Sequence, residues 1–270
     1  MSATYVIGDV HGCHEELSEL LDMIGPKIAD RFIFCGDLID RGPSVANVLK
    51  VVKDLKKRSN VDILRGNHEY KHERYEHSSS MKVDDDFISH HMELTDEDKG
   101  ILFGLPNFIK GDGFVVVHAG IPYWQNLPME THLRFDSGKP LNLEEAKKSS
   151  ILFFLRAEGP NRRPTVHGKP ISPGTYFWAE KYDGKHGFCY FGHEVFLDKS
   201  PRLFPNAMGL DTGCVFGGLL SAVRLAEDGT PDESFSVSAK KEYVKYDMNV
   251  LNGSSWRMAL NNKVQNAKQI

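Results

Sequence analysis

Residues 36–42 read Gly36-Asp37-Leu38-Ile39-Asp40-Arg41-Gly42 and directly follow a short apolar run, Phe32-Ile33-Phe34-Cys35. A shorter stretch of the same kind, Gly8-Asp9-Val10-His11-Gly12, follows Tyr5-Val6-Ile7. Short apolar runs bounded by glycine predict buried strands. Glycine also permits sharp turns and close backbone approach. We therefore expect two buried strands, each ending in a tight turn that carries potential metal ligands.

Helical patterns lie between these runs. Residues 14–24 place leucine and isoleucine at the spacing of one buried helix face, and the residues after Pro43 do the same with valine and leucine. A third apolar run, Val61-Asp62-Ile63-Leu64, follows. The alternation predicts parallel strands joined by right-handed crossovers. Ligands bind at the carboxyl ends of the strands in such sheets.

Three further blocks contain donor side chains next to glycine. They are Gly66-Asn67-His68-Glu69, His118-Ala119-Gly120 and Gly192-His193-Glu194. The last two follow apolar runs at residues 114–117 and 188–191. Carboxylate, amide and imidazole groups in one set suit two divalent ions, which about 3.5–4 Å apart can clamp a phosphate ester and generate hydroxide. The five blocks therefore predict a dinuclear metal site at strand ends.

The ligands divide between the two ions by position. Asp9 and His11 lie two residues apart and can bind one ion, and Asp37 is the natural bridge. The donors of the second ion are then Asn67, His118 and His193. These donors suit manganese, with iron or zinc as alternatives.

His68 is assigned a different role. Adjacent residues on an extended segment point apart, so we expect Asn67 and His68 not to bind the same ion. His68 is then placed to protonate the leaving group, and such an acid needs a carboxylate to orient it. Asp40 is the candidate for that carboxylate. Arg41 supplies a planar fork for phosphate oxygens.

The remaining histidines lie in polar segments, and we expect them to be solvated. They are His14, His72, His77, His90, His91, His132, His167 and His186. Thr95 is expected to cap a helix whose first turn is acidic. Strand patterns at residues 216–225 and 235–247 suggest a second, more antiparallel sheet.

The composition limits the classes of partner and the cellular compartment that we expect. The 270 residues are 40% hydrophobic and 26% charged, with a net charge of −4, so long nucleic acid is not expected as a partner. Four cysteines without a CxxC pair predict reduced, buried thiols. No signal peptide or membrane span is recognisable, which predicts a cytoplasmic protein without an obligate partner. We expect one domain, residues 1–270, with a helical excursion at about 70–112.

The five blocks, in this order, resemble the phosphoprotein phosphatase superfamily of calcineurin-like metallophosphoesterases. Residues 177–179, 190–194 and 210–218 are similar to its bacterial-type branch. The resemblance implies a mixed α/β fold, a β-sandwich of two mixed sheets flanked by helices. It implies the same ligands and the same roles for His68, Asp40 and Arg41. A second phosphate-binding arginine is expected, with Arg156 as the candidate and Arg134, Arg162 and Arg163 as alternatives.

Three functions remain open. The first is hydrolysis of phosphate monoesters, in the manner of a serine/threonine protein phosphatase acting on a phosphorylated protein. The alternative is a symmetrical bis(5'-nucleosyl)-tetraphosphatase or a related nucleotide or RNA-end phosphohydrolase, acting on a small substrate. The third is a non-catalytic phosphate-binding module, which the intact His68, Asp40 and Arg41 argue against.

Overall fold

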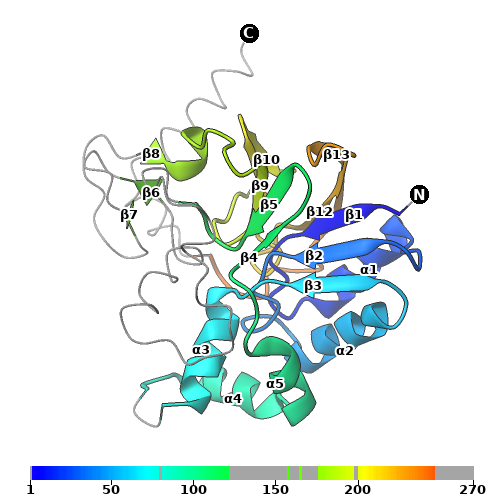
Figure 1. The fold of residues 1–270 in the computed structure, drawn as a ribbon. Coiled ribbons are helices and arrows are strands. Elements are labelled where there is room, and N and C mark those ends of the chain that lie inside the picture. The colour runs from blue at the N-terminus through cyan, green and yellow to red at the C-terminus, as the bar shows by residue number, and fades with distance from the viewer. Residues whose placement is uncertain are drawn as a thin grey trace.

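The computed structural model describes residues 2–78, 81–121, 157–158, 164–165, 176–197 and 200–246. Two five-stranded mixed sheets form its centre, and helices flank them (Figure 1). This arrangement confirms the predicted sandwich of two mixed sheets. No helix in the described part of the chain is long and apolar enough to cross a membrane.

The first sheet has the strand order β13-β12-β1-β2-β3. Its strands are β1 (Thr4–Ile7), β2 (Arg31–Phe34), β3 (Asn60–Ile63), β12 (Leu219–Leu225) and β13 (Pro231–Ser238). The first three are parallel and are linked by α1 (His14–Ile24) and α2 (Val45–Lys56), as the alternating pattern predicted. The prediction that the tail strands form a second sheet is wrong. They extend the first one, because β12 pairs antiparallel with the free edge of β1.

The second sheet has the order β10-β11-β9-β5-β4. Its strands are β4 (Phe108–Lys110), β5 (Phe114–Val117), β9 (Phe188–Phe191), β10 (Arg202–Phe204) and β11 (Ala207–Gly209). The central three, β5, β9 and β11, are parallel, and β4 and β10 are antiparallel edges. A small third sheet contains β6 (Ala157–Glu158), β7 (Pro164–Thr165) and β8 (Tyr176–Phe177), and the 3-10 helix η1 (Trp178–Glu180) follows it.

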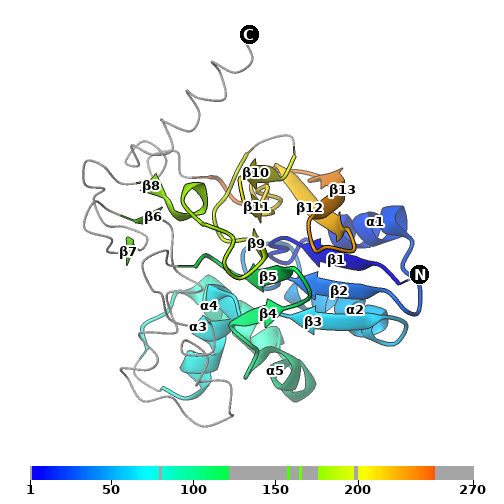
Figure 2. The ribbon, with the colours of Figure 1, turned by 45° about the horizontal axis from the view of Figure 1, so that its top comes forward.

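The core has layers on both faces of the first sheet. Tyr5 and Ile7 of β1 pack with α1 and α2, while Val6 between them packs with residues of the second sheet such as Val116 and Tyr190. This is the period of two that a strand imposes on its side chains. Figure 2 shows α1 and α2 on the outer side of the first sheet and the second sheet on the other side. The carboxyl ends of parallel strands from both sheets therefore approach one another.

Three helices lie between β3 and β4. They are α3 (Asn67–Glu76), α4 (Asp85–Glu93) and α5 (Asp96–Leu102). Asp84 accepts a hydrogen bond from Phe87 N and caps α4. Thr95 and Asp98 form a capping box at α5, which confirms Thr95 as the predicted cap.

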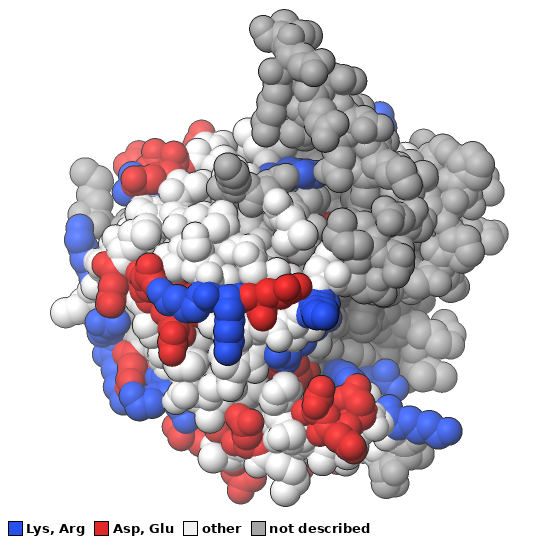
Figure 3. Space-filling view, turned by 180° about the vertical axis from the view of Figure 1, so that it is seen from behind, with Lys and Arg blue, Asp and Glu red and all other residues white. Residues whose placement is uncertain are grey.

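The distribution of surface charge and the state of the cysteines agree with the expectations from composition. Acidic and basic side chains intermingle on the face seen in Figure 3, and neither sign dominates it. All four cysteines are free and buried, as predicted.

Candidate active site

The predicted ligands follow the strand ends of both sheets. Asp9 and His11 come after β1, and Asp37 comes after β2. Asn67 is the first residue of α3, which begins a short turn after β3. The remaining two complete the set from the second sheet: His118 follows β5 and His193 follows β9. The fold therefore brings residues 184 positions apart in the sequence into contact, because the backbone N–H of His193 donates to the Asp9 carboxylate.

The backbone at these positions is strained. Five non-glycine residues in the described part of the chain have positive φ: His11 (45°), Asp37 (49°), Asp40 (70°), Arg41 (66°) and His193 (62°). A left-handed backbone costs an ordinary residue about 1–2 kcal/mol. Strain of this kind persists where surrounding structure enforces it, and it concentrates at functional sites. All five lie in the segments singled out from the sequence.

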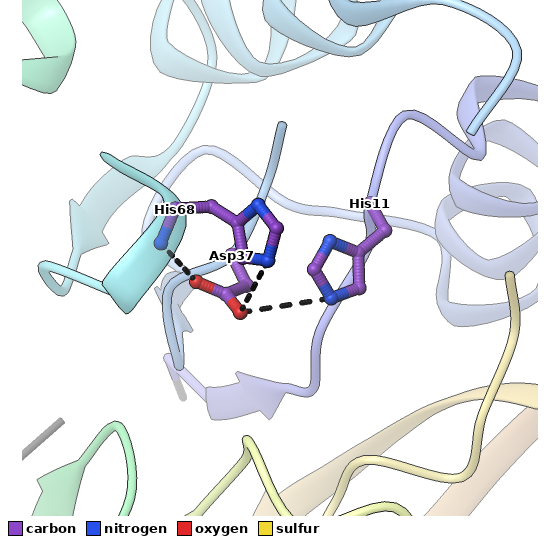
Figure 4. Close-up of side chains that lie close together, drawn as sticks. All are labelled: His11, Asp37 and His68. Carbon is purple, nitrogen blue, oxygen red and sulfur yellow. Dashed lines mark hydrogen bonds and ion pairs between the residues drawn. The ribbon is translucent and has the colours of Figure 1, made fainter. Parts of the chain in front are cut away.

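Asp37 is at the centre of the cluster. Its Oδ2 is 3.6 Å from His11 Nε2, 3.5 Å from His118 Nε2 and 3.9 Å from His68 Nε2. Figure 4 shows the Asp37 carboxylate facing the imidazoles of His11 and His68. Burial raises the pKa of Asp37, but His118, His68 and His11 outweigh it and lower that pKa to about 2. One carboxylate thus faces imidazoles from three separate segments.

The ring tautomers show that the cluster fits a cation. His11 Nδ1 is 3.0 Å from Ile39 O, and His118 Nδ1 is 2.8 Å from Cys35 O. A carbonyl oxygen only accepts, so both Nδ1 atoms donate, and in neutral rings both Nε2 lone pairs point at the Asp37 carboxylate. Burial lowers the pKa of both rings and keeps them neutral. Lone pairs that converge in this way suit a bound metal ion.

Further donors extend the cluster. His118 Nε2 is also 3.1 Å from Asn67 Oδ1, which is a second pair of acceptor atoms in contact. Ligand atoms of Asp37, His118 and His193 lie within 4.8 Å of one another, as do those of His11, Asp37 and His68. The residues present could therefore hold divalent metal.

Asp9 lies beside this cluster. Its Oδ2 accepts from His193 N at 3.0 Å, while its buried Oδ1 has no hydrogen-bond partner among the described residues. Burial and the neighbouring carboxylates of Asp211 and Asp37 raise the pKa of Asp9. A Cβ at position 192 would overlap Asp9 Oδ1. A glycine at position 192 is thus required for the carboxylate to approach.

His68 contacts Asp40, the carboxylate that the sequence offered as its partner, but the segment that carries His68 differs from the expected one. Its Nδ1 is 2.7 Å from Asp40 Oδ2, so its Nε2 faces the cluster. The expected extended segment is instead the first turn of α3. Consecutive helical residues point about 100° apart, so Asn67 and His68 still diverge. The expected extended conformation is therefore wrong, and the assignment of Asn67 and His68 to different roles stays a prediction.

Of the two arginines predicted to bind phosphate, the structure describes only Arg41. Arg41 Nη1 is 3.3 Å from His11 Nε2, and its guanidinium lies 5.6 Å from the centroid of Phe216. The guanidinium therefore reaches the edge of the cluster. Arg156 and its alternatives Arg134, Arg162 and Arg163 lie outside the described residues.

Several histidines near Asp40 were not predicted. His72 and His91 are buried rather than solvated, and His90 Nδ1 is 3.2 Å from Asp40 Oδ1. His72 Nε2 is 2.8 Å from the same oxygen. His68 and His72 have the i, i+4 spacing that places two side chains on one helix face. This signal would have identified His72 if α3 had been predicted to begin at Asn67.

Glu69 organises the loop that carries Asp37. It is fully buried, and Oε2 accepts from Asp37 N at 2.8 Å and from Gly66 N at 3.0 Å. Its Oε1 accepts from Leu38 N at 2.8 Å. One carboxylate thereby joins the turn after β2 to the start of α3.

Comparisons with known proteins identify relatives that match most of the chain. The chain is 32% identical to bis(5'-nucleosyl)-tetraphosphatase PrpE [asymmetrical] of Oceanobacillus iheyensis, over 92% of this chain and 98% of the relative. It is 28% identical to a symmetrical bis(5'-nucleosyl)-tetraphosphatase of Nitrosomonas europaea, over 83% and 96%. The structure of a serine/threonine phosphatase from Saccharomyces cerevisiae shares the fold, with a TM-score of 0.56 at 16% identity over 91% and 81%.

Residues 3–196 match the family described as calcineurin-like phosphoesterase. This match covers most of the chain and includes all five sequence blocks. It confirms that the chain is an enzyme of the hydrolase class, a metallophosphoesterase, as the resemblance implied. The chain belongs to the calcineurin-like phosphoesterase family.

Proposed function

We propose that the chain is a bis(5'-nucleosyl)-tetraphosphatase, which hydrolyses a phosphoanhydride bond of a dinucleoside tetraphosphate. The similarity to the Oceanobacillus iheyensis enzyme over 92% of the chain carries the proposal. Relatives of this kind reverse the ranking made from the sequence, which placed a protein phosphatase first. The fold shared with the yeast phosphatase is compatible with either substrate.

Six residues would hold the two metal ions, and Asp37 would be shared by both. They are Asp9, His11, Asp37, Asn67, His118 and His193. When bound, two divalent cations activate water and neutralise charge on the phosphate. We propose manganese as the metal, and iron or zinc suit the same donors.

The chain's own residues supply the remaining steps. Asp40 accepts the Nδ1 hydrogen of His68, which keeps Nε2 directed at the cluster. His68 Nε2 protonates the oxygen of the leaving group. Arg41 lies at the edge of the cluster and contacts non-bridging phosphate oxygens with its planar fork. Arg156 stays a prediction for a second such contact.

The relatives are of two kinds, asymmetrical and symmetrical, which differ in the phosphoanhydride bond that is hydrolysed. Attack on a terminal phosphorus of the tetraphosphate gives a nucleoside triphosphate and a monophosphate, whereas attack on an inner phosphorus next to the central bridging oxygen gives two diphosphates. We propose the asymmetrical outcome, because the relative at 32% identity bears that designation. The location in the cytoplasm stays a prediction from the sequence.

The substrate test compares three compounds with manganese present. They are diadenosine tetraphosphate, a phosphoserine peptide and an aryl phosphate. We expect the largest kcat/KM for the dinucleotide, with ATP and AMP as products. If the products were two ADP molecules, the asymmetrical assignment would be rejected, but the tetraphosphatase assignment would stand. A larger kcat/KM for the peptide would reject the proposed substrate and restore the protein phosphatase.

A further inference from the structure

A chain of polar contacts leads away from the active site through helices α3 and α4. Asp40 faces His68 Nδ1 with Oδ2 (2.7 Å) and His72 Nε2 with Oδ1 (2.8 Å). His72 Nδ1 is 2.9 Å from His91 Nδ1. His91 Nε2 is 3.0 Å from Glu76 Oε2. The two imidazoles therefore link two carboxylates.

The geometry of the two rings supports a direct hydrogen bond. The ring planes of His72 and His91 differ by 13°, and their centroids are 5.2 Å apart. With the two Nδ1 atoms 2.9 Å apart, these values place the rings end to end. The line that joins the two Nδ1 atoms then lies close to the planes of both rings. A well-aligned N–H···N hydrogen bond requires this direction.

Counting protons gives the charge of this pair. Nε2 of each ring faces a carboxylate and must carry a hydrogen, and one further hydrogen must lie between the two Nδ1 atoms. That makes three protons on two rings, whereas two neutral imidazoles carry two. The contacts are satisfied when His72 and His91 together bear one positive charge.

The surroundings agree with this count. Burial raises the pKa of Asp40, but hydrogen bonds from His68, His72 and His90 hold it well below its usual range. The hydrogen bond from Lys99 lowers the pKa of Glu76. Both carboxylates are therefore ionised and only accept.

Apolar rings enclose the pair. Burial and the neighbouring imidazole lower the pKa of His91. The His72 ring is fully buried. Water is kept away from this ring, because Phe87 covers it with 4.2 Å between ring centroids and is itself 2% exposed. Tyr75 lies edge-on to His91 at 4.9 Å. Lys71 lies over the Phe87 ring.

We propose that His72 is a positioning residue, which with His91 forms a singly charged imidazole pair that fixes the Asp40 carboxylate and through it the ring of His68. The positioning role rests on the proposed function, because it requires His68 to act as the acid. The charge of the pair does not depend on that function and can be measured by itself.

The first experiment reads the protons directly. Nitrogen NMR of ¹⁵N-histidine protein at pH 8 distinguishes protonated from bare ring nitrogens, and signals are assigned through His72→Gln and His91→Gln. An exposed histidine with a pKa of about 6.5 is neutral at this pH. We expect three protonated nitrogens on the pair. Two would overturn the proposal, whichever substrate the enzyme prefers.

The second experiment tests positioning by kinetics. We expect His72→Gln to lower kcat for an alkyl phosphate about tenfold, a part of the 10²–10⁴ that acid–base catalysis contributes. KM should stay unchanged, and an aryl phosphate with an acidic leaving group should lose much less. An equal loss on both substrates would overturn the positioning role.

A control variant lies in the same segment. His77 follows α3 directly and is exposed, so His77→Gln should change neither the signals of the pair nor kcat. If the NMR result holds but the phosphopeptide is the better substrate, the proposed function fails and the charged pair stands. The two proposals therefore fail separately.

Discussion

The strand ends and the helices α3 and α4 place side chains on one site by different means. At the strand ends, His11, Asp37 and His193 are on left-handed turns. On the helices, His72 and His91 are on regular backbone and meet only because α4 packs against α3. The turn that presents each strand-end ligand is formed by a few neighbouring residues. The contact between His72 and His91 instead requires two helices to pack against each other.

The largest effect is expected at the bridging carboxylate of the strand ends. Asp37→Asn removes a negative charge that faces three imidazoles. We expect kcat/KM to fall about 10³-fold or more, because metal contributes several kcal/mol to phosphoryl transfer. Metal content, measured by elemental analysis, should fall with it. Asp54→Asn is the control, since Asp54 is exposed and pairs with Lys50 and Lys57. Retained metal and activity in the Asp37 variant would contradict the site.

The next effect separates the acid from the ligands. His68→Ala should lower kcat for alkyl phosphates by about 10²–10⁴. Substrates with acidic leaving groups need little protonation and should lose far less. Metal content should stay near that of the unmodified protein, in contrast to Asp37→Asn. Equal losses on both kinds of substrate would reject His68 as the acid.

A third effect concerns stability where the two regions join. Glu69→Gln replaces a carboxylate oxygen that accepts a backbone hydrogen bond with an amide NH₂ that cannot accept. We expect unfolding free energy to fall by about 1–3 kcal/mol, the cost of an unsatisfied buried group. Urea denaturation measures it. Glu97→Gln is the control, because that side chain is 72% exposed. Equal effects in the two variants would show that the Glu69 contacts do not hold the turn.

The strand-end residues could be predicted from the sequence, because glycine and a potential metal ligand follow each apolar run. Asp37, His118 and His193 are brought together as their positions predicted. Prediction failed where the outcome depends on pairing between elements. His72 and His91 were expected in water, because nothing near them in the sequence specifies that α4 covers α3. The tail strands were assigned to the wrong sheet for the same reason, since the free edge of β1 is a property of the fold.

The smallest effect tests backbone conformation alone. Gly100 lies inside α5, and Gly25 caps α1 with φ +66°; a Cβ at either position meets nothing within 4 Å. Gly100→Ala should raise the unfolding free energy by about 0.5–1 kcal/mol, because alanine loses less entropy in a helix. Gly25→Ala should lower it by about 1–2 kcal/mol, because the left-handed region disfavours a Cβ. Since neither change alters packing, the difference between the two measures what left-handed backbone costs in this chain. The five strained residues of the active site sustain that cost together, so a small difference here would mean that their turns need little support from the fold.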